Sequence, residues 1–166
     1  MLGLAAQWLG VNQTQANSVA PILISEEQGR HKSTFCRMLM PPQLARYYSD
    51  NLKLTAQGNP ERLLAEMGLL NMDEFDKFGA QKMPLLKNLM QMSSLNICKA
   101  YQKNFRSLPR IASFIGTSNR TDLLCDPTGS RRFICIEAEH DIDCTGIEHS
   151  QIYAQLKEEL LAGARH

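Results

Sequence analysis

The sequence predicts an α/β domain built on a mainly parallel sheet with helices on both faces. Short apolar runs alternate with longer amphipathic stretches along the chain, and no internal repeat is present. Strands and helices that alternate in this way form parallel sheets covered on both faces. Polar segments follow three of the apolar runs, after Ile24, Met72 and Gly116. In parallel sheets such segments meet at the edge where the strands end, which is where ligands bind.

The individual elements follow from apolar runs and from the prolines and glycines that interrupt them. Pro41 and Pro42 end one helical stretch, Pro60 suits the first turn of the next, and Gly68 ends that one. Residues 96–110 combine basic and aromatic side chains and predict a hairpin. Expected strands cover residues 19–24, 44–48, 69–72, 111–116 and 132–137, and expected helices cover residues 33–40, 59–67, 82–92 and 150–161.

Length and composition limit the possible classes of protein. A chain of 166 residues fits one domain, and 43% hydrophobic with 21% charged residues is ordinary for a soluble globular protein. The net charge of +1 provides no overall basic field, so any DNA contact needs a local patch.

The five cysteines form no Cys-x-x-Cys pair, which argues against a zinc site and a disulfide framework and favours the cytoplasm. No apolar run approaches the roughly 20 residues that span a membrane. Both ends of the chain are abrupt, and we expect residues 1–166 to be one domain excised from a longer protein.

The segment ILISEEQGRHKSTF resembles a phosphate-binding loop, in which a strand leads through a polar loop into a helix. A lysine there would reach the β- and γ-phosphates of ATP, and a following hydroxyl would bind Mg²⁺. Glu26 and His31 stand where the usual pattern has glycines. The alternative is a polar turn in which Ser33 or Thr34 caps a helix. The expected nucleotide-binding residues are Gly29, Arg30, His31, Lys32, Ser33 and Thr34.

The acidic segment GLLNMDEFDKF offers two carboxylates directly after an apolar run. We expect Asp73 to hold Mg²⁺ together with Ser33, and Glu74 to polarise the water that attacks the γ-phosphate. The alternative is a solvated loop in which Asp73 caps a helix. Asp76 is expected to be a surface or capping residue.

The segment RIASFIGTSNRTDLLCDPTGSRRFICIE ends an apolar run in polar residues and then presents two arginines. Asn119 is placed to hydrogen-bond a γ-phosphate or the attacking water. Arg131 and Arg132 follow a tight-turn sequence, and one of them, preferably Arg131, can reach the ATP of a neighbouring subunit. Alternatively, the arginines pair with carboxylates such as Asp126 or Glu137.

Three pieces in one order, QGRHKSTF, LLNMDEFD and FIGTSNRTDLLCDPTGSRRF, resemble the virulence-associated E family of phages and other mobile elements. That family is similar to the AAA+ and superfamily 3 helicase ATPases. The resemblance covers about residues 19–137 and implies a three-layer αβα P-loop NTPase fold. It also implies ATP and Mg²⁺ as cofactors and a role in replication or maintenance of a mobile element. Carried over, Lys32 and Ser33 belong to the nucleotide loop, Asp73 and Glu74 to the acidic pair, Asn119 to the sensor, and Arg131 with Arg132 to the arginine-finger region.

The segment KAYQKNFRSLPR mixes basic and aromatic residues just before the sensor strand. Basic side chains contact phosphates and aromatic rings stack on bases, so this hairpin is expected to bind single-stranded DNA. The alternative is a solvated hairpin with its aromatic rings in the core. The expected contacts are Lys99, Lys103, Arg106 and Arg110.

The leading hypothesis is therefore a helicase-like ATPase motor domain that acts on DNA as a homo-oligomeric ring. A second hypothesis is a degenerate nucleotide-binding module in which Glu26 and His31 have ended catalysis and the domain only assembles. A small-molecule kinase is third, because the sequence offers no candidate lid or acceptor pocket.

Overall fold

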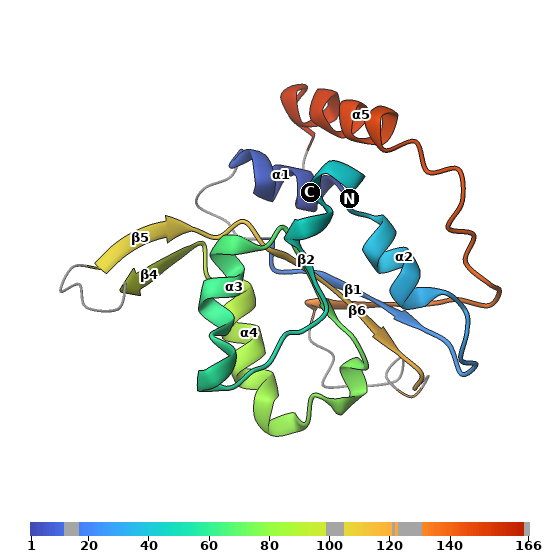
Figure 1. The fold of residues 1–166 in the computed structure, drawn as a ribbon, viewed down its shortest axis with the longest axis horizontal. Coiled ribbons are helices and arrows are strands. Elements are labelled where there is room, and N and C mark those ends of the chain that lie inside the picture. Colours follow the sequence, from blue (N-terminus) through green and yellow to red (C-terminus); the bar gives the residue numbers. More distant parts are fainter. Residues whose placement is uncertain (12–16, 99–104, 121, 123–130, 165–166) are drawn as a thin grey trace.

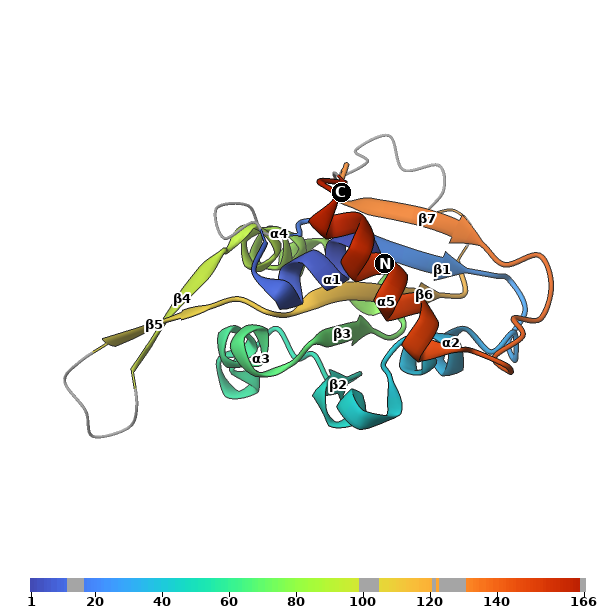
Figure 2. The same ribbon diagram turned by 90° about the horizontal axis from the view of Figure 1, so that it is seen from above.

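The central sheet of the computed structural model contains five parallel strands in the order β2-β3-β6-β1-β7 (Figure 1, Figure 2). The structure describes residues 1–11, 17–98, 105–120, 122 and 131–164. The predicted α/β class with a mainly parallel sheet is confirmed. The strands are β1 (Ala20–Ile24), β2 (Tyr48–Ser49), β3 (Leu69–Met72), β6 (Ser113–Ser118) and β7 (Phe133–Glu137).

In the described part of the chain, five helices and several short 3₁₀ turns connect and cover these strands. Four of the helices were predicted within two residues at each end, and the apolar stretch at the start of the chain forms the fifth. The helices are α1 (Leu2–Leu9), α2 (Lys32–Met38), α3 (Pro60–Glu66), α4 (Met83–Gln91) and α5 (His149–Leu161), and the turns are η1 (Pro42–Tyr47), η2 (Ala56–Gly58), η3 (Phe75–Lys77) and η4 (Ala80–Lys82). None of the helices in the described part of the chain has the length and apolar character needed to cross a membrane.

Helices pack on both faces of the sheet because the strand side chains alternate. On one face Ile22, Leu70 and Phe114 pack against α3 and α4, through residues such as Leu64 and Leu89. On the other face, Leu23, Leu69 and Ile115 pack against α1 and α2. Helix α5 lies on the outer side of α1, where Leu156 and Leu160 contact Ala5 and Ala6 (Figure 2). The sheet is thus the middle of three layers.

Two predicted strands begin later than their sequences suggest. The expected strand at residues 44–48 is mostly wrong: η1 follows Pro41, and only Tyr48 and Ser49 pair with β3. The expected strand at residues 111–116 begins at Ser113, because the N–H groups of Ile111 and Ala112 both donate to Leu64 O at the end of α3.

The predicted hairpin is formed by β4 (Ser94–Cys98) and β5 (Phe105–Pro109), which pair antiparallel. It projects from the body of the domain at the end where the strands of the central sheet begin (Figure 1, Figure 2). The chain passes from β5 directly into β6, so one continuous segment runs from the hairpin to the opposite edge of the sheet.

Candidate functional site

The ends of β1, β3 and β6 lie side by side at one edge of the sheet. Strand β6 pairs with both neighbours, and the register places Ser118 beside Ile24 and Gly116 beside Met72. From β1 the chain continues to β2 on one side of the sheet, and from β6 it continues to β7 on the other. In open parallel sheets, ligands bind in the crevice beyond the carboxyl ends of neighbouring strands such as these.

A pocket of about 440 Å³ occupies this crevice. Every residue predicted to act on nucleotide, metal or water from within the same chain contributes to its lining. The predicted residues that line it are Gly29, Arg30, His31, Lys32, Ser33, Thr34, Asp73, Glu74 and Asn119. Three further lining residues, Gln28, Thr117 and Ser118, were not predicted to have a role.

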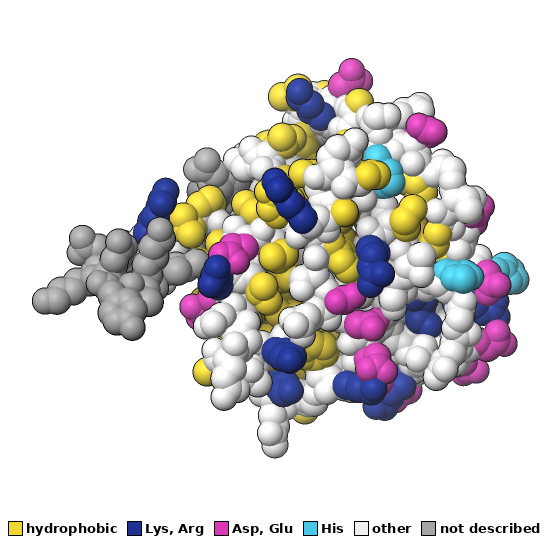
Figure 3. All heavy atoms as spheres, in the orientation of Figure 1, with side chains coloured by type: hydrophobic (Ala, Val, Ile, Leu, Met, Phe, Trp, Pro, Cys, Tyr) yellow, Lys and Arg dark blue, Asp and Glu magenta, His cyan; other side chains and the backbone are white. Residues whose placement is uncertain are grey.

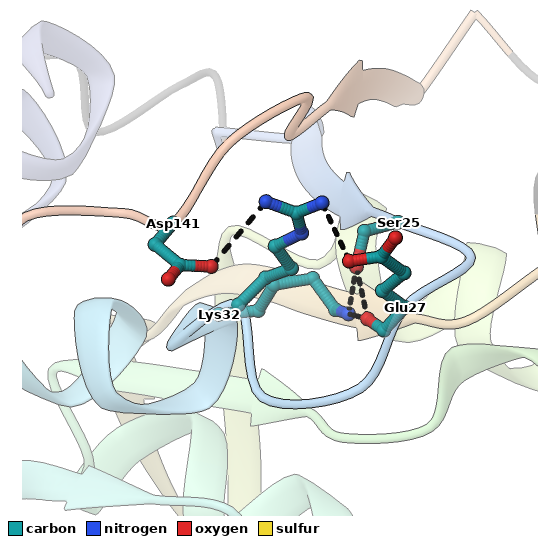
Figure 4. A network of polar contacts seen from close by, with 5 residues as sticks. Ser25, Glu27, Lys32 and Asp141 are labelled. Carbon is teal, nitrogen blue, oxygen red and sulfur yellow. Dashed lines mark hydrogen bonds and ion pairs between the residues drawn. The ribbon is translucent and has the colours of Figure 1, made fainter.

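Lys32 begins α2, and its ammonium group lies inside the loop that precedes the helix. The side chain is 8% exposed, and its Nζ donates to Ser25 Oγ (Figure 4) and, at 2.8 Å, to Asn119 Oδ1. A longer contact of 3.5 Å reaches Glu27 O. Burial lowers the pKa of Lys32, although the Asp73 carboxylate opposes that effect. Each of these acceptors is neutral, so within the described part of the chain no carboxylate is hydrogen-bonded to this buried cation, and an anion in the pocket would be stabilised by it.

The backbone around Lys32 explains why phosphate-binding loops favour glycine at the position of His31. His31 is left-handed with φ of 57°, and Gly29 is also left-handed with φ of 86°. Histidine is among the residues enriched in this region of backbone space, so it adopts the conformation with moderate strain. The exposed imidazole lies at the rim of the pocket. The substitution therefore retains the turn that a glycine would form.

The side chain of Arg30 forms ion pairs that stabilise the loop between β1 and α2. Its guanidinium pairs with Glu27 at 2.6 Å and with Asp141 at 3.3 Å, so Glu27 and Asp141 both face this loop (Figure 4). Its carbonyl accepts from the N–H of Ile142 at 3.3 Å. The segment that follows β7 therefore runs along the loop between β1 and α2 and braces it.

Ser33 and Asp73 approach each other from α2 and from the end of β3. Ser33 Oγ donates to Asp73 Oδ1 at 2.8 Å, and Thr117 Oγ1 donates to the same oxygen at 2.6 Å. Adjacent ligands of an octahedral Mg²⁺, each about 2.1 Å from the ion, are about 2.9 Å apart. The Ser33 and Asp73 oxygens therefore have the chemistry and the spacing of two Mg²⁺ ligands, and the remaining positions are those that waters and phosphates usually fill.

Glu74 follows in a left-handed conformation with φ of 52°, which is uncommon for a residue with a side chain. Its N–H donates to Thr117 Oγ1 at 3.4 Å, and its carboxylate pairs with Lys77 at 2.6 Å. Backbone strain of this kind concentrates at functional sites. Both partners of the ion pair are more than half exposed, so Lys77 is a weak restraint on Glu74.

The side chain of Asp76 differs from its predicted surface or capping role. It is half-buried, and its Oδ1 accepts from Ser118 Oγ at 2.6 Å. No sequence periodicity predicts this contact, since the two residues lie 42 positions apart.

Arg131 and Arg132 lie at the opposite edge of the sheet from the pocket. They directly precede β7, whose first residue Phe133 is beside Ala20 at the beginning of β1. Arg131 is exposed, whereas Arg132 is half-buried and its carbonyl accepts from the N–H of Ala20. Neither arginine lines the pocket of its own chain. The predicted partner carboxylate Asp126 lies outside the described residues.

The residues predicted to contact nucleic acid divide into three cases. Lys99 and Lys103 lie outside the described residues. Arg106 is exposed on β5. Arg110 requires a correction, because it is 1% exposed and its guanidinium donates to the carbonyls of Ala112, Met90 and Asn17. Burial lowers its pKa to about 10. Arg110 thus fastens the base of the hairpin to the body and faces no ligand.

Surface charge is otherwise mixed. On the face shown in Figure 3, acidic and basic side chains are interspersed and do not form separate patches. This agrees with the near-neutral sequence.

Comparisons with known structures place the fold. The chain resembles "The apo structure of NrS-1 C terminal region (305-718)", with a TM-score of 0.55 and 22% identity over 98% of this chain. Two further structures, "The A form apo structure of NrS-1 C terminal region-CTR(305-718)" and "The A form apo structure of NrS-1 C terminal region-CTR", give TM-scores of 0.54 and 0.52 at 22% and 21% identity, over 94% and 98% of this chain. The chain spans only 42%, 37% and 41% of those three chains, in the order given. At this level of identity the likeness concerns the fold alone.

Sequence comparison is more specific. No curated protein is significantly similar to the chain. Residues 10–165 match the virulence-associated protein E-like domain, which includes all three polar segments around the pocket. Since this match covers nearly the whole chain, the protein belongs to the virulence-associated protein E-like domain family.

Proposed function

We propose that this domain binds Mg·ATP in the pocket beyond β1, β3 and β6 and hydrolyses it. The observation that supports this most directly is the meeting of Lys32, Ser33, Asp73 and Asn119, which come from three separate segments. A cation, a hydroxyl, a carboxylate and an amide in this arrangement match what triphosphate binding requires.

Each functional residue of the pocket has a proposed role that follows from its chemistry. Lys32 would exchange its neutral partners for phosphate oxygens and retain its charge, since an anion favours the ammonium form. Ser33 and Asp73 would hold Mg²⁺, which neutralises charge on the β- and γ-phosphates. Glu74 would accept a proton from the attacking water or orient it, and Asn119 would hydrogen-bond the γ-phosphate.

The degenerate assembly module remains the second candidate, and one observation favours it. Glu74 pairs with Lys77 at 2.6 Å, and although this exposed pair is a weak restraint, it would have to open before Glu74 could act on water. The two candidates share nucleotide binding and differ only in hydrolysis. The kinase hypothesis gains no support, because the described pocket is lined by the phosphate-binding, acidic and sensor segments alone.

The helicase-like role in DNA replication or maintenance of a mobile element is the wider proposal. Membership of the virulence-associated protein E-like family supports it. The projecting hairpin with exposed Arg106 is the proposed contact for single-stranded DNA. Because Arg131 is exposed and far from its own pocket, its proposed partner is the ATP of a neighbouring copy in a ring. Full activity in a strictly monomeric preparation would contradict the oligomeric part.

The experiment that tests the proposal combines Mg·ATP titration with a phosphate-release assay. Lys32→Ala is expected to abolish binding, and Glu74→Gln is expected to retain binding and stop release. Lys157→Ala is the matched control, because Lys157 is an exposed lysine on α5. Equal ATP affinity in wild type and Lys32→Ala would refute the proposal. Tight binding without phosphate release in the wild type would leave the assembly module as the function.

A further inference from the structure

Two consecutive hydroxyls at the end of β6 fasten this strand to the acidic segment. Thr117 Oγ1 donates to Asp73 Oδ1 and Ser118 Oγ donates to Asp76 Oδ1, both at 2.6 Å. Thr117 is in register with Leu23, which packs toward α2, and Ser118 with Ile24, which packs toward α3 and α4. Successive strand residues point to opposite faces, so the two carboxylates hold the strand end from both sides of the sheet.

The Ser118 contact fixes the backbone around Asn119. Ser118 is 2% exposed, and its Oγ accepts from the N–H of Arg120 at 3.1 Å while it donates to Asp76. A serine hydroxyl that accepts from the N–H two residues later closes a small turn. Asn119 is the middle residue of that turn, and its Oδ1 accepts from Lys32 Nζ.

We propose that Asp76 is a positioning residue that acts through Ser118 to aim Asn119 at the γ-phosphate and at Lys32. This inference rests on the proposed function, and it assigns a task to a carboxylate that touches neither Lys32 nor the pocket surface. Without the Asp76 acceptor, the Ser118 hydroxyl is free to rotate, and the turn that carries Asn119 loses its anchor to η3.

A competing explanation is that Asp76 acts only by its charge. Its carboxylate lies close enough to Arg120 to contribute to raising the pKa of that side chain, and Lys77 is its neighbour in sequence. The two explanations differ for Asp76→Asn. An asparagine keeps an oxygen that accepts from Ser118 but removes the charge, so only the hydrogen-bond explanation predicts that it retains activity.

The experiment compares Asp76→Ala, Asp76→Asn, Ser118→Ala and the Asp76→Ala/Ser118→Ala double variant. Asp76→Ala and Ser118→Ala are each expected to lower kcat about tenfold, as loss of about 1.4 kcal/mol would, with KM changed by less than about twofold. The double variant is expected to be no worse than Ser118→Ala alone, because Ser118→Ala already removes the bond to Asp76 together with the bond from the Arg120 N–H. Asp76→Asn is expected to retain most of kcat. Glu66→Ala, a surface carboxylate paired with Arg62 on α3, is the control.

A second readout does not need ATP. Acetylation of Lys32, followed by peptide mass spectrometry, is expected to be several-fold faster in Asp76→Ala and Ser118→Ala than in wild type, because Asn119 no longer covers the ammonium. If wild type fails to hydrolyse ATP but these variants expose Lys32, the proposed function falls and the positioning role stands. Unchanged kcat and unchanged Lys32 acetylation in Asp76→Ala, or equal loss in Asp76→Asn, would overturn the positioning role.

Discussion

Thr117→Val removes one hydroxyl from the site and leaves the volume of the side chain almost unchanged. Thr117 is 3% exposed, donates to Asp73 at 2.6 Å and accepts from the N–H of Glu74. A hydrogen bond to a charged group contributes about 1.5–3 kcal/mol. Since Asp73 is itself exposed, solvent screens part of this, and we expect the free energy of unfolding to fall by about 1.5 kcal/mol. Urea denaturation measures this value directly.

The same variant should also weaken the metal site. Thr117 fixes the oxygen of Asp73 that faces Ser33, so its loss frees that carboxylate to rotate away from the position proposed for Mg²⁺. We expect a higher Mg²⁺ concentration to be needed for half-maximal ATP binding. Thr145→Val is the matched control, because Thr145 donates to Asp143 at 2.7 Å on an exposed loop. Equal unfolding free energies for wild type and Thr117→Val, with unchanged Mg²⁺ dependence, would refute this reasoning.

Three further predictions concern the loop and the base of the hairpin. Burial lowers the pKa of Lys32 below 10.5, so as the pH rises the folded state releases that proton before the unfolded state does. Raising the pH toward 10.5 should therefore increase the free energy of unfolding of wild type relative to that of Lys32→Met, as measured by urea denaturation at each pH. If the free energies of the two proteins changed equally with pH, the burial of Lys32 would be contradicted. His31→Gly should keep or raise ATP affinity in a titration, because glycine adopts a positive φ without strain, and a large loss of affinity would mean that the imidazole itself contacts the nucleotide. Arg110→Met should lower the free energy of unfolding by about 3 kcal/mol in urea denaturation, about 1 kcal/mol for each of the carbonyls of Ala112, Met90 and Asn17 that loses its donor. Arg106→Ala should have little effect. Equal stability of these two variants would contradict the structural role of Arg110.

The strands of the central sheet could be predicted from the sequence because each strand of the core is a separate apolar run. β3 (Leu69–Met72) was predicted at its observed bounds, since four consecutive buried residues lie between Gly68 and Asp73. β2 was overestimated because residues 44–48 look apolar whether they form a strand or a 3₁₀ turn. Pro41 and Pro42 favour the turn η1 at the beginning of this segment, and pairing with β3 begins only at Tyr48.

The site could be located from sequence, but its internal contacts could not. The polar residues after three strands were expected to meet, because parallel strands end at one edge. Which oxygen pairs with which hydroxyl depends on registers between distant segments, as in the contact of Asp76 with Ser118. The prediction that Arg110 contacts nucleic acid was wrong for a related reason. A basic residue in a basic, aromatic stretch gives no sign that the backbone carbonyls of Ala112, Met90 and Asn17 surround it.

Strand β6 connects the two ends of the domain, and this bears on how nucleotide and DNA contacts could communicate. It begins at Ser113, three residues after Arg110, where the hairpin is fastened to α4 through Met90 O, and it ends at Ser118, directly before Asn119, whose amide contacts Lys32. All six of its residues are buried; residues 113–116 pair with β3 and residues 116–118 pair with β1. Because each residue is buried and paired with at least one neighbouring strand, a shift at either end is expected to be shared by those neighbours. A change of partner at Lys32 would therefore reach the hairpin through a rigid element, and the contacts of Arg110 are where that movement would be passed on.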